Sequence, residues 1–368
     1  MADPSKVRFA IVGLGHFAQT AILPAFVNAK KNATLAALVT SDPEKASELG
    51  ERYDVPTFDY EQYEQLMNSG DIDAVYIAVP NSEHCKFAVL AAEAGVHVLC
   101  EKPLAHTSAD AEQMVEACRK SNVKLMTAYR LHFEEGNLNT IETIRANKIG
   151  EARLFESIHT MQVDPENIRI DLSLGGGPIE DIGVYCLNAA RYVFQDEPDE
   201  VFAFAVHGQD PRFTEVPESV SVTMRFPGDR LASFLCGFGE TKVSQYRVIG
   251  TNGTLTMDPA FTWQRDIVQT IAVKGKKKSH SFKHRDQVAA ELIYFSNCVL
   301  TNQPPEPLGT EGLIDVEIIE AIRCSYSENR PVTIKTTAKA ARPNGSQNIE
   351  RSPHDEPEPV NAAPPSNE

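Results

Sequence analysis

Hydrophobic and polar positions divide the first third of the chain into short apolar runs and longer amphipathic segments. The runs are rich in Val, Ile, Leu and Ala and have few polar positions, which is typical of parallel strands buried on both faces. They lie at 7–12, 34–39, 73–79, 97–100 and 124–129. The amphipathic segments lie between them, at 20–30, 43–52, 60–68, 82–94 and 108–121. We therefore predict an α/β domain with a doubly wound parallel sheet, of the Rossmann type, over residues 1–129.

The pattern changes after about residue 130. A helix at 136–147, a strand near 152–163 and a helix from about residue 178 come first, and strands with no helix between them follow. These strands are expected at 200–207, 219–226, 231–238, 243–249, 253–257 and 266–274. Two further helices are expected at 286–302 and 310–327. Successive strands indicate an antiparallel sheet, so residues 130–340 are predicted to form an α+β domain.

The last segment, 341–368, has a different composition. It holds six of the 23 prolines, no aromatic residue, and two Arg against five Asp and Glu. Such a segment has little apolar surface to offset the entropy lost on ordering. We expect a disordered tail.

Composition and charge narrow the class of protein. Lys and Arg number 35 and Asp and Glu 51, which gives a formal net charge of −16. An acidic chain repels phosphate backbones and anionic membrane surfaces, so neither nucleic acid nor membrane is expected as a partner. The chain has no long apolar run that would span a membrane and no pattern typical of a secretory signal. The seven scattered cysteines have no metal-ligand spacing and fit reduced thiols in a cytoplasmic protein, and we predict no metal site.

The clearest motif is a glycine turn after the first apolar run. Gly13, Gly15 and Ala18 form a G-x-G-x-x-A pattern between a strand and a helix. This arrangement allows a tight turn, close approach of a pyrophosphate and close packing of the helix, and the helix N-terminus favours an anion. We expect a dinucleotide here, with His16 and Phe17 beside it.

The end of the second strand indicates which dinucleotide. Thr40 and Ser41 can donate hydrogen bonds, and Lys45 can pair with a 2′-phosphate, which favours NADP. Asp42 is the opposing feature. It either caps the helix that starts at Pro43 or contacts a ribose, and the second alternative leaves NAD open.

Ligands of such sheets lie beyond the carboxyl ends of the strands, so the loops there supply further candidates. Lys102 follows the strand that ends at residue 100 and should face the nicotinamide, and Pro103 fixes the backbone after it, with a cis bond as one option. The remaining candidates for cofactor contact at these strand ends are Pro80, Asn81, His84, Glu101 and Arg130. Capping or packing is the alternative for His84, and a structural ion pair is the alternative for Arg130.

A second constellation follows the triple glycine at 175–177. Asp181 and Tyr185 are four residues apart on one helix and share a face. A phenol can act as a base when a nearby ammonium favours its ionised form. From the residues alone, a solvated helix face is the competing interpretation.

Several motifs in this order resemble the Gfo/Idh/MocA oxidoreductase family, with the strongest likeness to glucose–fructose oxidoreductase and related aldose oxidoreductases. The resemblance covers roughly residues 6–335 and rests on five segments. They are GLGHFA from residue 13, VPNSEH (79–84), CEKPLA (100–105), AYRLHF (128–133) and GGGPIEDIGVYCLNAARYVF (175–194).

The resemblance implies a Rossmann domain followed by a domain with an open, mostly antiparallel sheet that often forms a homo-oligomer interface. It implies that Lys102, Asp181 and Tyr185 are catalytic, with tyrosine typical of the branch that oxidises sugars and dihydrodiols. Many relatives have Trp-Arg before the triple glycine, whereas this chain has Ile168-Arg169. Arg169 is therefore expected at the cofactor without a stacking Trp.

These observations predict an NADP-dependent sugar oxidoreductase that transfers hydride from the anomeric carbon of a cyclic aldose to nicotinamide. One form retains its cofactor and reduces a second sugar to an alditol. A simple aldose or dihydrodiol dehydrogenase that releases its cofactor and a non-catalytic dinucleotide-binding sensor are the alternatives. The basic stretch 274–285 is expected to be a solvated hairpin tip.

Overall fold

The computed structural model describes residue 3, residues 5–335 and residues 342–366. The chain forms two compact units. The first unit comprises Met1–Arg130, Arg285–Leu313 and Ile349–Pro364, and the second comprises Leu131–His284, Ile314–Asn348 and the residues from Pro365 on. The structure therefore differs from a simple division into 1–129, 130–340 and a tail, because two late segments of the chain belong to the first unit.

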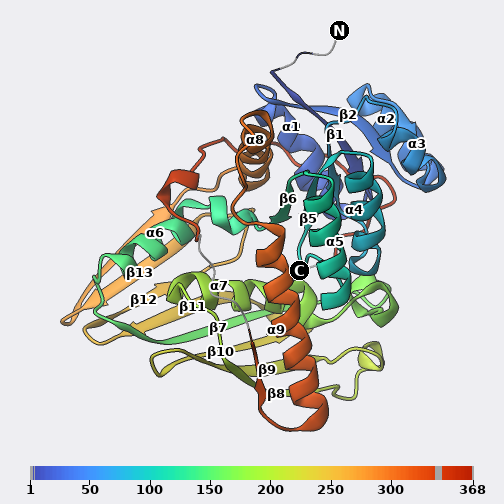
Figure 1. Cartoon of the computed structure of the whole chain (residues 1–368). Helices are drawn as coiled ribbons and strands as arrows, with labels where there is room; N and C mark the ends of the chain where they lie inside the picture. The colour runs from blue at the N-terminus through green and yellow to red at the C-terminus, as the bar shows by residue number, and fades with distance from the viewer. Residues whose placement is uncertain (1–2, 4, 336–341, 367–368) are drawn as a thin grey trace. The chain divides into compact units, whose positions relative to one another are not determined.

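A six-stranded parallel sheet forms the core of the first unit, as the apolar runs predict (Figure 1). In sheet order its strands are β3 (Thr57–Phe58), β2 (Ala33–Val39), β1 (Val7–Val12), β4 (Ala74–Ile77), β5 (His97–Glu101) and β6 (Leu125–Ala128). The central strands β1 and β4 are almost completely buried, since helices cover both faces. The strand order reverses between β1 and β4, and ligands of such sheets bind at that point, beyond the carboxyl ends.

Helices connect these strands and cover the sheet. They are η1 (Ala18–Ile22), α1 (Leu23–Ala29), α2 (Pro43–Tyr53), η2 (Tyr60–Gln62), α3 (Tyr63–Met67), η3 (Asn81–Glu83), α4 (His84–Glu93), α5 (Ser108–Lys120) and α8 (Gln287–Leu300). Helix α8 comes from the region predicted to be the second domain. Its Phe295 ring lies 6.3 Å from the Phe9 ring of β1, and its Ile293 carbonyl accepts a hydrogen bond from Asn32. Helical periodicity identifies this helix but does not show which sheet buries its apolar face.

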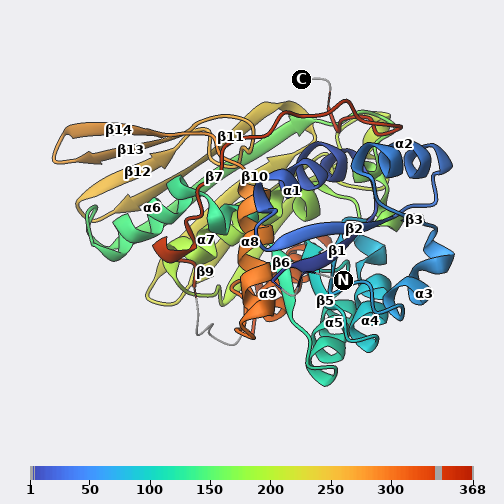
Figure 2. The ribbon, with the colours of Figure 1, turned by 90° about the horizontal axis from the view of Figure 1, so that it is seen from above.

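The second unit contains a nine-stranded sheet that is mostly antiparallel (Figure 2). In sheet order its strands are β14 (Lys276–Phe282), β13 (Ile267–Val273), β12 (Gly253–Met257), β11 (Gly239–Gly250), β7 (Ala152–Gln162), β10 (Arg230–Gly237), β9 (Ser219–Phe226), β8 (Glu200–Val206) and β15 (Val332–Thr333). Within the described residues, β7 and β10 are the one parallel neighbouring pair. The basic stretch is solvated, as expected, since β14 is exposed except at Phe282. It is not only a hairpin tip, however, because most of it forms the outer strand paired with β13.

Helices lie against one face of this sheet. They include α6 (Glu135–Arg145), η7 (Ile179–Gly183), α7 (Val184–Phe194) and most of α9 (Gly309–Glu328), with short 3-10 turns η4 (Arg130–Phe133), η5 (Ile168–Ile170), η6 (Leu172–Leu174), η8 (Pro211–Phe213) and η9 (Gly345–Gln347). The contacts are tight: a Cβ on Gly183 would lie 3.0 Å from the Cys236 Sγ of β10. The start of α7 thus packs directly on strand β10 of the sheet.

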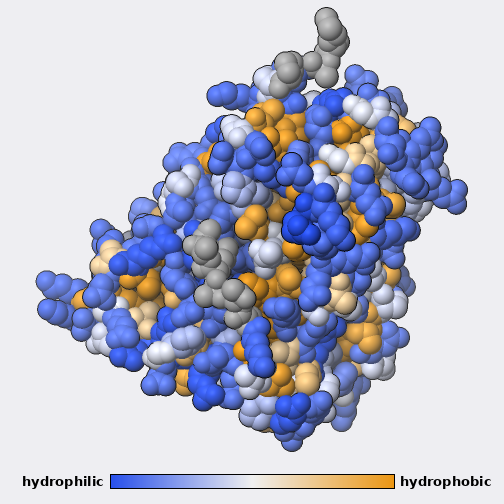
Figure 3. Space-filling view, viewed as in Figure 1, coloured by the Kyte–Doolittle hydropathy of each residue, from blue (hydrophilic) through white to orange (hydrophobic). Residues whose placement is uncertain are grey.

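The opposite face of the nine-stranded sheet carries exposed apolar side chains. Leu154, Phe204, Val206, Leu231 and Leu235 are 42–58% exposed, on strands β7, β8 and β10. In β10, the alternate residues Ala232, Phe234 and Cys236 are buried toward the helices. Strand alternation therefore places a second apolar surface on the face opposite these helices. The face of the molecule seen in Figure 3 is mostly hydrophilic, with smaller hydrophobic areas between.

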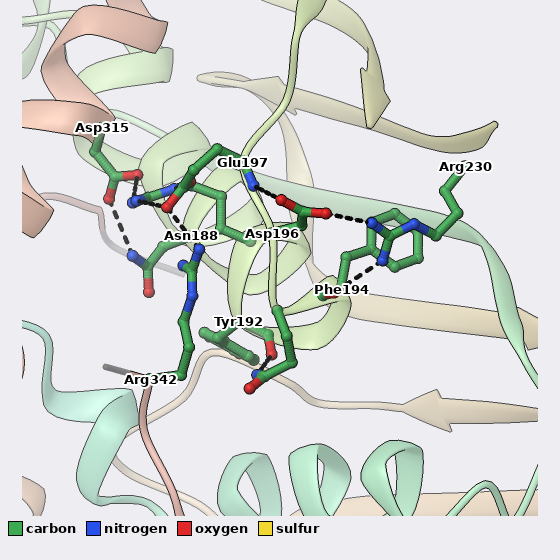
Figure 4. Close-up of polar contacts among 10 residues, drawn as sticks. Asn188, Tyr192, Phe194, Asp196, Glu197, Arg230, Asp315 and Arg342 are labelled. Carbon is green, nitrogen blue, oxygen red and sulfur yellow. Dashed lines mark hydrogen bonds and ion pairs between the residues drawn. The ribbon is translucent and has the colours of Figure 1, made fainter. Parts of the chain in front are cut away.

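The C-terminal segment is ordered in the described residues 342–366, contrary to the expectation of a disordered tail. Arg342 donates a hydrogen bond of 2.6 Å to Glu197, a buried carboxylate that also binds the fully buried Arg191 (Figure 4). Further along, Gln347 and Val360 are buried. Composition predicts how much apolar surface a segment can bury. It does not predict hydrogen bonds between that segment and distant residues.

Candidate active site

The glycine turn closes tightly between the ends of three strands. Gly13 has a φ of +90°, its amide donates to the Val39 carbonyl, and a Cβ at this position would lie only 2.6 Å from the Ala78 carbonyl oxygen. Only glycine accepts both this conformation and this approach. By contrast, a Cβ on Gly15 would meet nothing within 4 Å. The turn therefore leaves open space at Gly15, where a pyrophosphate group fits.

The helix after this turn begins at Ala18, which is 1% exposed and packs directly on the sheet. Its first five residues form a π-helical turn, and α1 continues it to Ala29. His16 and Phe17 lie half-buried at the start of the helix, and the His16 carbonyl accepts a hydrogen bond from the Thr20 hydroxyl. The residues present thus fit the phosphate end of a dinucleotide, as the motif predicts.

Asp42 caps helix α2 at the end of the second strand. Its Oδ1 accepts hydrogen bonds from the amides of Glu44 and Lys45, and the Lys45 amide contributes most to lowering the pKa of this carboxyl. The Lys45 ammonium lies 3.8 Å from Oδ2, and the buried Thr40 hydroxyl accepts from the Asp42 amide. Of the two sequence alternatives for Asp42, the structure shows the cap. Lys45 and the exposed Ser41 stand beside it.

The Glu101-Lys102-Pro103 segment follows β5. The Lys102–Pro103 bond is cis, as the sequence allowed. Glu101 accepts hydrogen bonds from the fully buried Tyr76 hydroxyl at 2.8 Å and from the Lys102 amide at 3.3 Å. Burial raises the pKa of the Glu101 carboxyl. Glu101 therefore has a structural role, because its carboxylate connects the Lys102 backbone to Tyr76 in the interior of the sheet.

His84 does not lie at a cofactor surface, so its predicted contact with the cofactor needs correction. Its side chain is fully buried, with Nδ1 3.1 Å from the Pro103 carbonyl and Nε2 3.0 Å from the Val79 carbonyl. Burial lowers the pKa of His84. The imidazole thus links the loops that follow β4 and β5. This agrees with the packing alternative from the sequence.

Arg130 is also buried, at 5% exposure, and it donates a 2.6 Å hydrogen bond to Gln287 at the start of α8. This contact gives Arg130 a structural partner, although that partner is an amide and not the carboxylate of an ion pair. Pro80 and Asn81 lie directly beyond β4, where Pro80 precedes the short helix η3 and Asn81 begins it. They occupy the strand-end position that the sequence predicts for them.

In the second unit, the triple glycine folds the preceding loop back on itself. The amides of Gly176 and Gly177 donate to the carbonyls of Asp171 and Arg169, each at 2.9 Å. A Cβ on Gly176 would lie 2.4 Å from the Arg169 carbonyl oxygen, so a larger residue would separate these segments. The glycines thereby hold the loop containing Arg169 against the start of η7.

This folding places Arg169 against Asp181. The Arg169 Nε donates to Asp181 Oδ2 at 2.6 Å, and its Nη1 donates to Asn167. Both members of the ion pair keep partial access to solvent, with side chains 28% and 19% exposed. The sequence predicted Arg169 at the cofactor. The structure pairs Arg169 with the carboxylate of Asp181, and its contact with the cofactor stays a prediction.

Tyr185 lies at the start of α7, one turn after Asp181. Its ring is stacked on Phe261 with centroids 5.9 Å apart, and it meets the edge of His159 at 5.7 Å. The ring of His159 in turn lies 5.0 Å from that of Phe261, and its Nδ1 is 3.3 Å from the Ile182 carbonyl. These two rings fix the plane of the tyrosine ring. Neither ring can be placed there from the sequence alone, because strand pairing and a long loop bring them to Tyr185.

No group of three or more His, Cys, Asp or Glu residues in the described part of the chain could hold a metal ion. None of its helices is long and apolar enough to cross a membrane.

Comparison with known proteins identifies both halves of the chain. Residues 7–129 match the oxidoreductase family with an NAD-binding Rossmann fold, and residues 137–256 match the Gfo/Idh/MocA C-terminal domain. The D-xylose 1-dehydrogenase [NADP(+)] of Haloarcula marismortui is 32% identical over 330 residues, which cover 87% of this chain and 91% of that protein.

Solved structures agree with this assignment. The aldose-aldose oxidoreductase of Caulobacter crescentus is 36% identical with a TM-score of 0.85, over 89% of this chain and all of that one. A 3-ketoreductase of Actinomadura kijaniata, solved with NADP and TDP-benzene, is 25% identical with a TM-score of 0.80, over 87% of this chain and 98% of that one.

Proposed function

Because the chain belongs to the Gfo/Idh/MocA family of NAD(P)-dependent oxidoreductases and is a sugar oxidoreductase, we propose that it oxidises the anomeric carbon of a cyclic aldose to an aldonolactone. The observation that carries the proposal is the arrangement of Arg169, Asp181 and Tyr185. An oriented carboxylate lies one helical turn before a phenol that two aromatic rings hold in place. A carboxylate and a phenol so close together suit proton transfer from a sugar hydroxyl.

In the proposed reaction, Tyr185 takes the proton of the C1 hydroxyl. Bound cofactor, in its oxidised form NADP+, would supply the acceptor for the hydride of C1. Lys102 supplies a positive charge that stabilises the oxygen as its proton leaves. Asp181 accepts a hydrogen bond from a neighbouring sugar hydroxyl and so orients the ring, while Arg169 holds the carboxylate in position.

The cofactor contacts are proposed from the first unit. The turn at Gly13–Ala18 receives the pyrophosphate, with His16 and Phe17 beside it. Thr40, Ser41 and Lys45 receive the adenosine ribose and its 2′-phosphate.

Product analysis tests this proposal. The protein is purified without added cofactor and its absorbance is recorded near the reduced-nicotinamide band at ~340 nm. It then receives D-xylose or D-glucose, with and without added NADP. Aldonate that forms only with added NADP supports a dehydrogenase that releases its cofactor. Equal amounts of aldonate and alditol without added NADP support a retained cofactor and coupled reduction of a second sugar. No product despite intact NADP binding would refute the catalytic proposal in favour of a sensor.

We also propose that the protein is a homo-oligomer through the apolar face of the nine-stranded sheet. Leu154 and Leu231 are paired neighbours on β7 and β10, and both are exposed there. Exposed apolar groups on adjacent strands are typical of an interface. Light scattering of the wild type and of Leu231→Asp tests this: a monomeric wild type contradicts the proposal, and a variant of lower mass supports it. We place the protein in the cytoplasm, since its seven cysteines are all free thiols.

A further inference from the structure

We propose that residues 352–361, here called the C-terminal strap, close over the dinucleotide site of the first unit and slow the release of NADP(H). The inference depends on dinucleotide binding but not on which sugar reaction the protein catalyses. In Figure 2 the red C-terminal segment runs beside α1 and toward α2. Its contacts there connect it with the two turns predicted to hold the cofactor.

The first contact is with the glycine turn. The fully buried side chain of Gln19 donates from Nε2 to the carbonyls of Leu14 at 2.9 Å and Val360 at 2.8 Å. Its Oε1 accepts the Val360 amide at 2.7 Å. Leu14 lies between Gly13 and Gly15, so one side-chain amide joins the backbone of the strap to the backbone of the turn. Val360 itself is 7% exposed.

The second contact is with the turn after β2. The Asn361 side-chain amide lies 2.5 Å from Glu44 Oε2 and 3.5 Å from Asp42 Oδ2. Asp42 caps the helix beside Lys45, where the adenosine end of the dinucleotide is proposed to bind. Asn361 has a φ of +43°, and this left-handed conformation turns the chain between the two contacts. Two successive residues of the strap thus contact both turns.

The beginning of the strap is held as well. His354 Nδ1 lies 2.9 Å from Asp286, and its Nε2 lies 3.1 Å from the Thr20 carbonyl, one residue beyond Gln19. Asn28 of α1 donates to the Ser352 carbonyl at 2.8 Å. Three of the ten strap residues are Pro353, Pro357 and Pro359, which restrict the backbone of the free segment and reduce the entropy lost when it binds.

These contacts should make the strap slow the release of a bound dinucleotide. A segment that binds both turns must detach before a dinucleotide beneath it can leave, so the release rate depends on how often the strap opens. Weakening its hydrogen bonds should therefore speed release. The bonds of Asn361 and His354 are suitable targets because neither residue belongs to the turns themselves.

The experiment measures NADPH release directly. Protein loaded with NADPH is mixed with excess NADP+, and the loss of bound-NADPH fluorescence gives the dissociation rate. Asn361→Gly keeps the left-handed conformation while removing the amide, and it is combined with His354→Ala. The loss of several hydrogen bonds should speed release about tenfold or more. Asp355→Asn, at an exposed strap residue, is the matched control and should keep the wild-type rate.

A folded double variant that releases NADPH within about twofold of the wild-type rate would overturn the proposal. Hydrogen exchange of the wild type gives a second test that needs no variant. The Val360 amide should exchange more slowly when NADPH is bound, and equal exchange with and without NADPH would also contradict the strap. A protein that binds NADPH but oxidises no sugar would refute the proposed reaction and leave both tests of the strap valid.

Discussion

The guanidinium of Arg169 donates from Nε to Asp181 Oδ2 across 2.6 Å, and the folded-back triple glycine holds the two residues together. This contact assigns Arg169 to the carboxylate that precedes Tyr185. A cofactor contact and a carboxylate contact have different consequences for kinetics. The first affects dinucleotide affinity, and the second affects turnover.

Replacement of this arginine separates the two roles. Arg169→Met should lower kcat for aldose oxidation about tenfold or more, because Asp181 loses its charged hydrogen-bond donor. The dissociation constant for NADPH, measured by fluorescence titration, should remain within about twofold of the wild type. A large loss of NADPH affinity with kcat intact would restore the cofactor role expected from the sequence. Arg153→Met, at an exposed surface pair with Glu151, is the control.

Lys45 should determine the preference for NADP. Lys45→Ala removes the ammonium proposed to pair with the 2′-phosphate, so NADPH affinity should fall about 10–100-fold while NADH affinity stays unchanged. Titration of both cofactors against the variant and against Lys31→Ala, an exposed control, measures this ratio. Equal losses for NADPH and NADH would show that Lys45 acts on something other than the phosphate.

His84 should affect stability more than chemistry. Its buried ring links the carbonyls of Val79 and Pro103, so His84→Ala should lower the free energy of unfolding by about 2 kcal/mol or more. Denaturant unfolding of the apoprotein measures this change. A variant as stable as the wild type but with much weaker NADPH binding would favour the direct cofactor contact predicted from the sequence.

The strap should respond to pH through His354. Burial is the largest single effect and disfavours the charged form. The hydrogen bond and charge of Asp286, the Thr20 carbonyl and the charge of Glu356 together outweigh it, and the pKa of His354 is raised above the usual 6.5. Asp286 and Glu356 are the charged groups that favour the imidazolium. The charged contact between His354 and Asp286 therefore stabilises the bound strap fully below a pH of about 6.5. This stabilisation is lost as pH rises through the raised pKa.

NADPH release should therefore be faster at about pH 9 than at about pH 6, and His354→Gln should reduce this difference. The comparison with the variant is needed because the cofactor phosphate and Lys45 also carry charge. If wild type and variant have the same pH dependence of release, His354 does not control the strap.

The local pattern of apolar and polar residues was enough to predict the two sheets. The strands around the glycine turn are nearly all apolar, so a parallel sheet followed from their composition, and the turn chemistry of Gly13 depends on adjacent residues alone. The series of strands after residue 200 likewise predicted the second sheet. Its β14 strand was missed, because a polar outer strand has no apolar alternation to reveal it.

Contacts between distant residues explain what the sequence did not show. Phe295 of α8 packs near Phe9, and Gln19 binds Val360, across separations that periodicity cannot assess. His159 reaches Tyr185 only because β7 runs beneath α7. For His84, residue type suggested a ligand contact, and only burial with its two carbonyl contacts revealed a structural role.

The central claim is that Tyr185 is the base for oxidation of an aldose at C1. Its most direct test is the turnover of D-xylose by Tyr185→Phe, with NADPH affinity measured on the same sample. If Tyr185 is this base, turnover should fall about 10²–10⁴-fold, the usual contribution of a positioned proton-transfer group, with NADPH affinity unchanged. Turnover within a few-fold of the wild type would contradict it and would assign the proton to another group, with Asp181 as the first candidate.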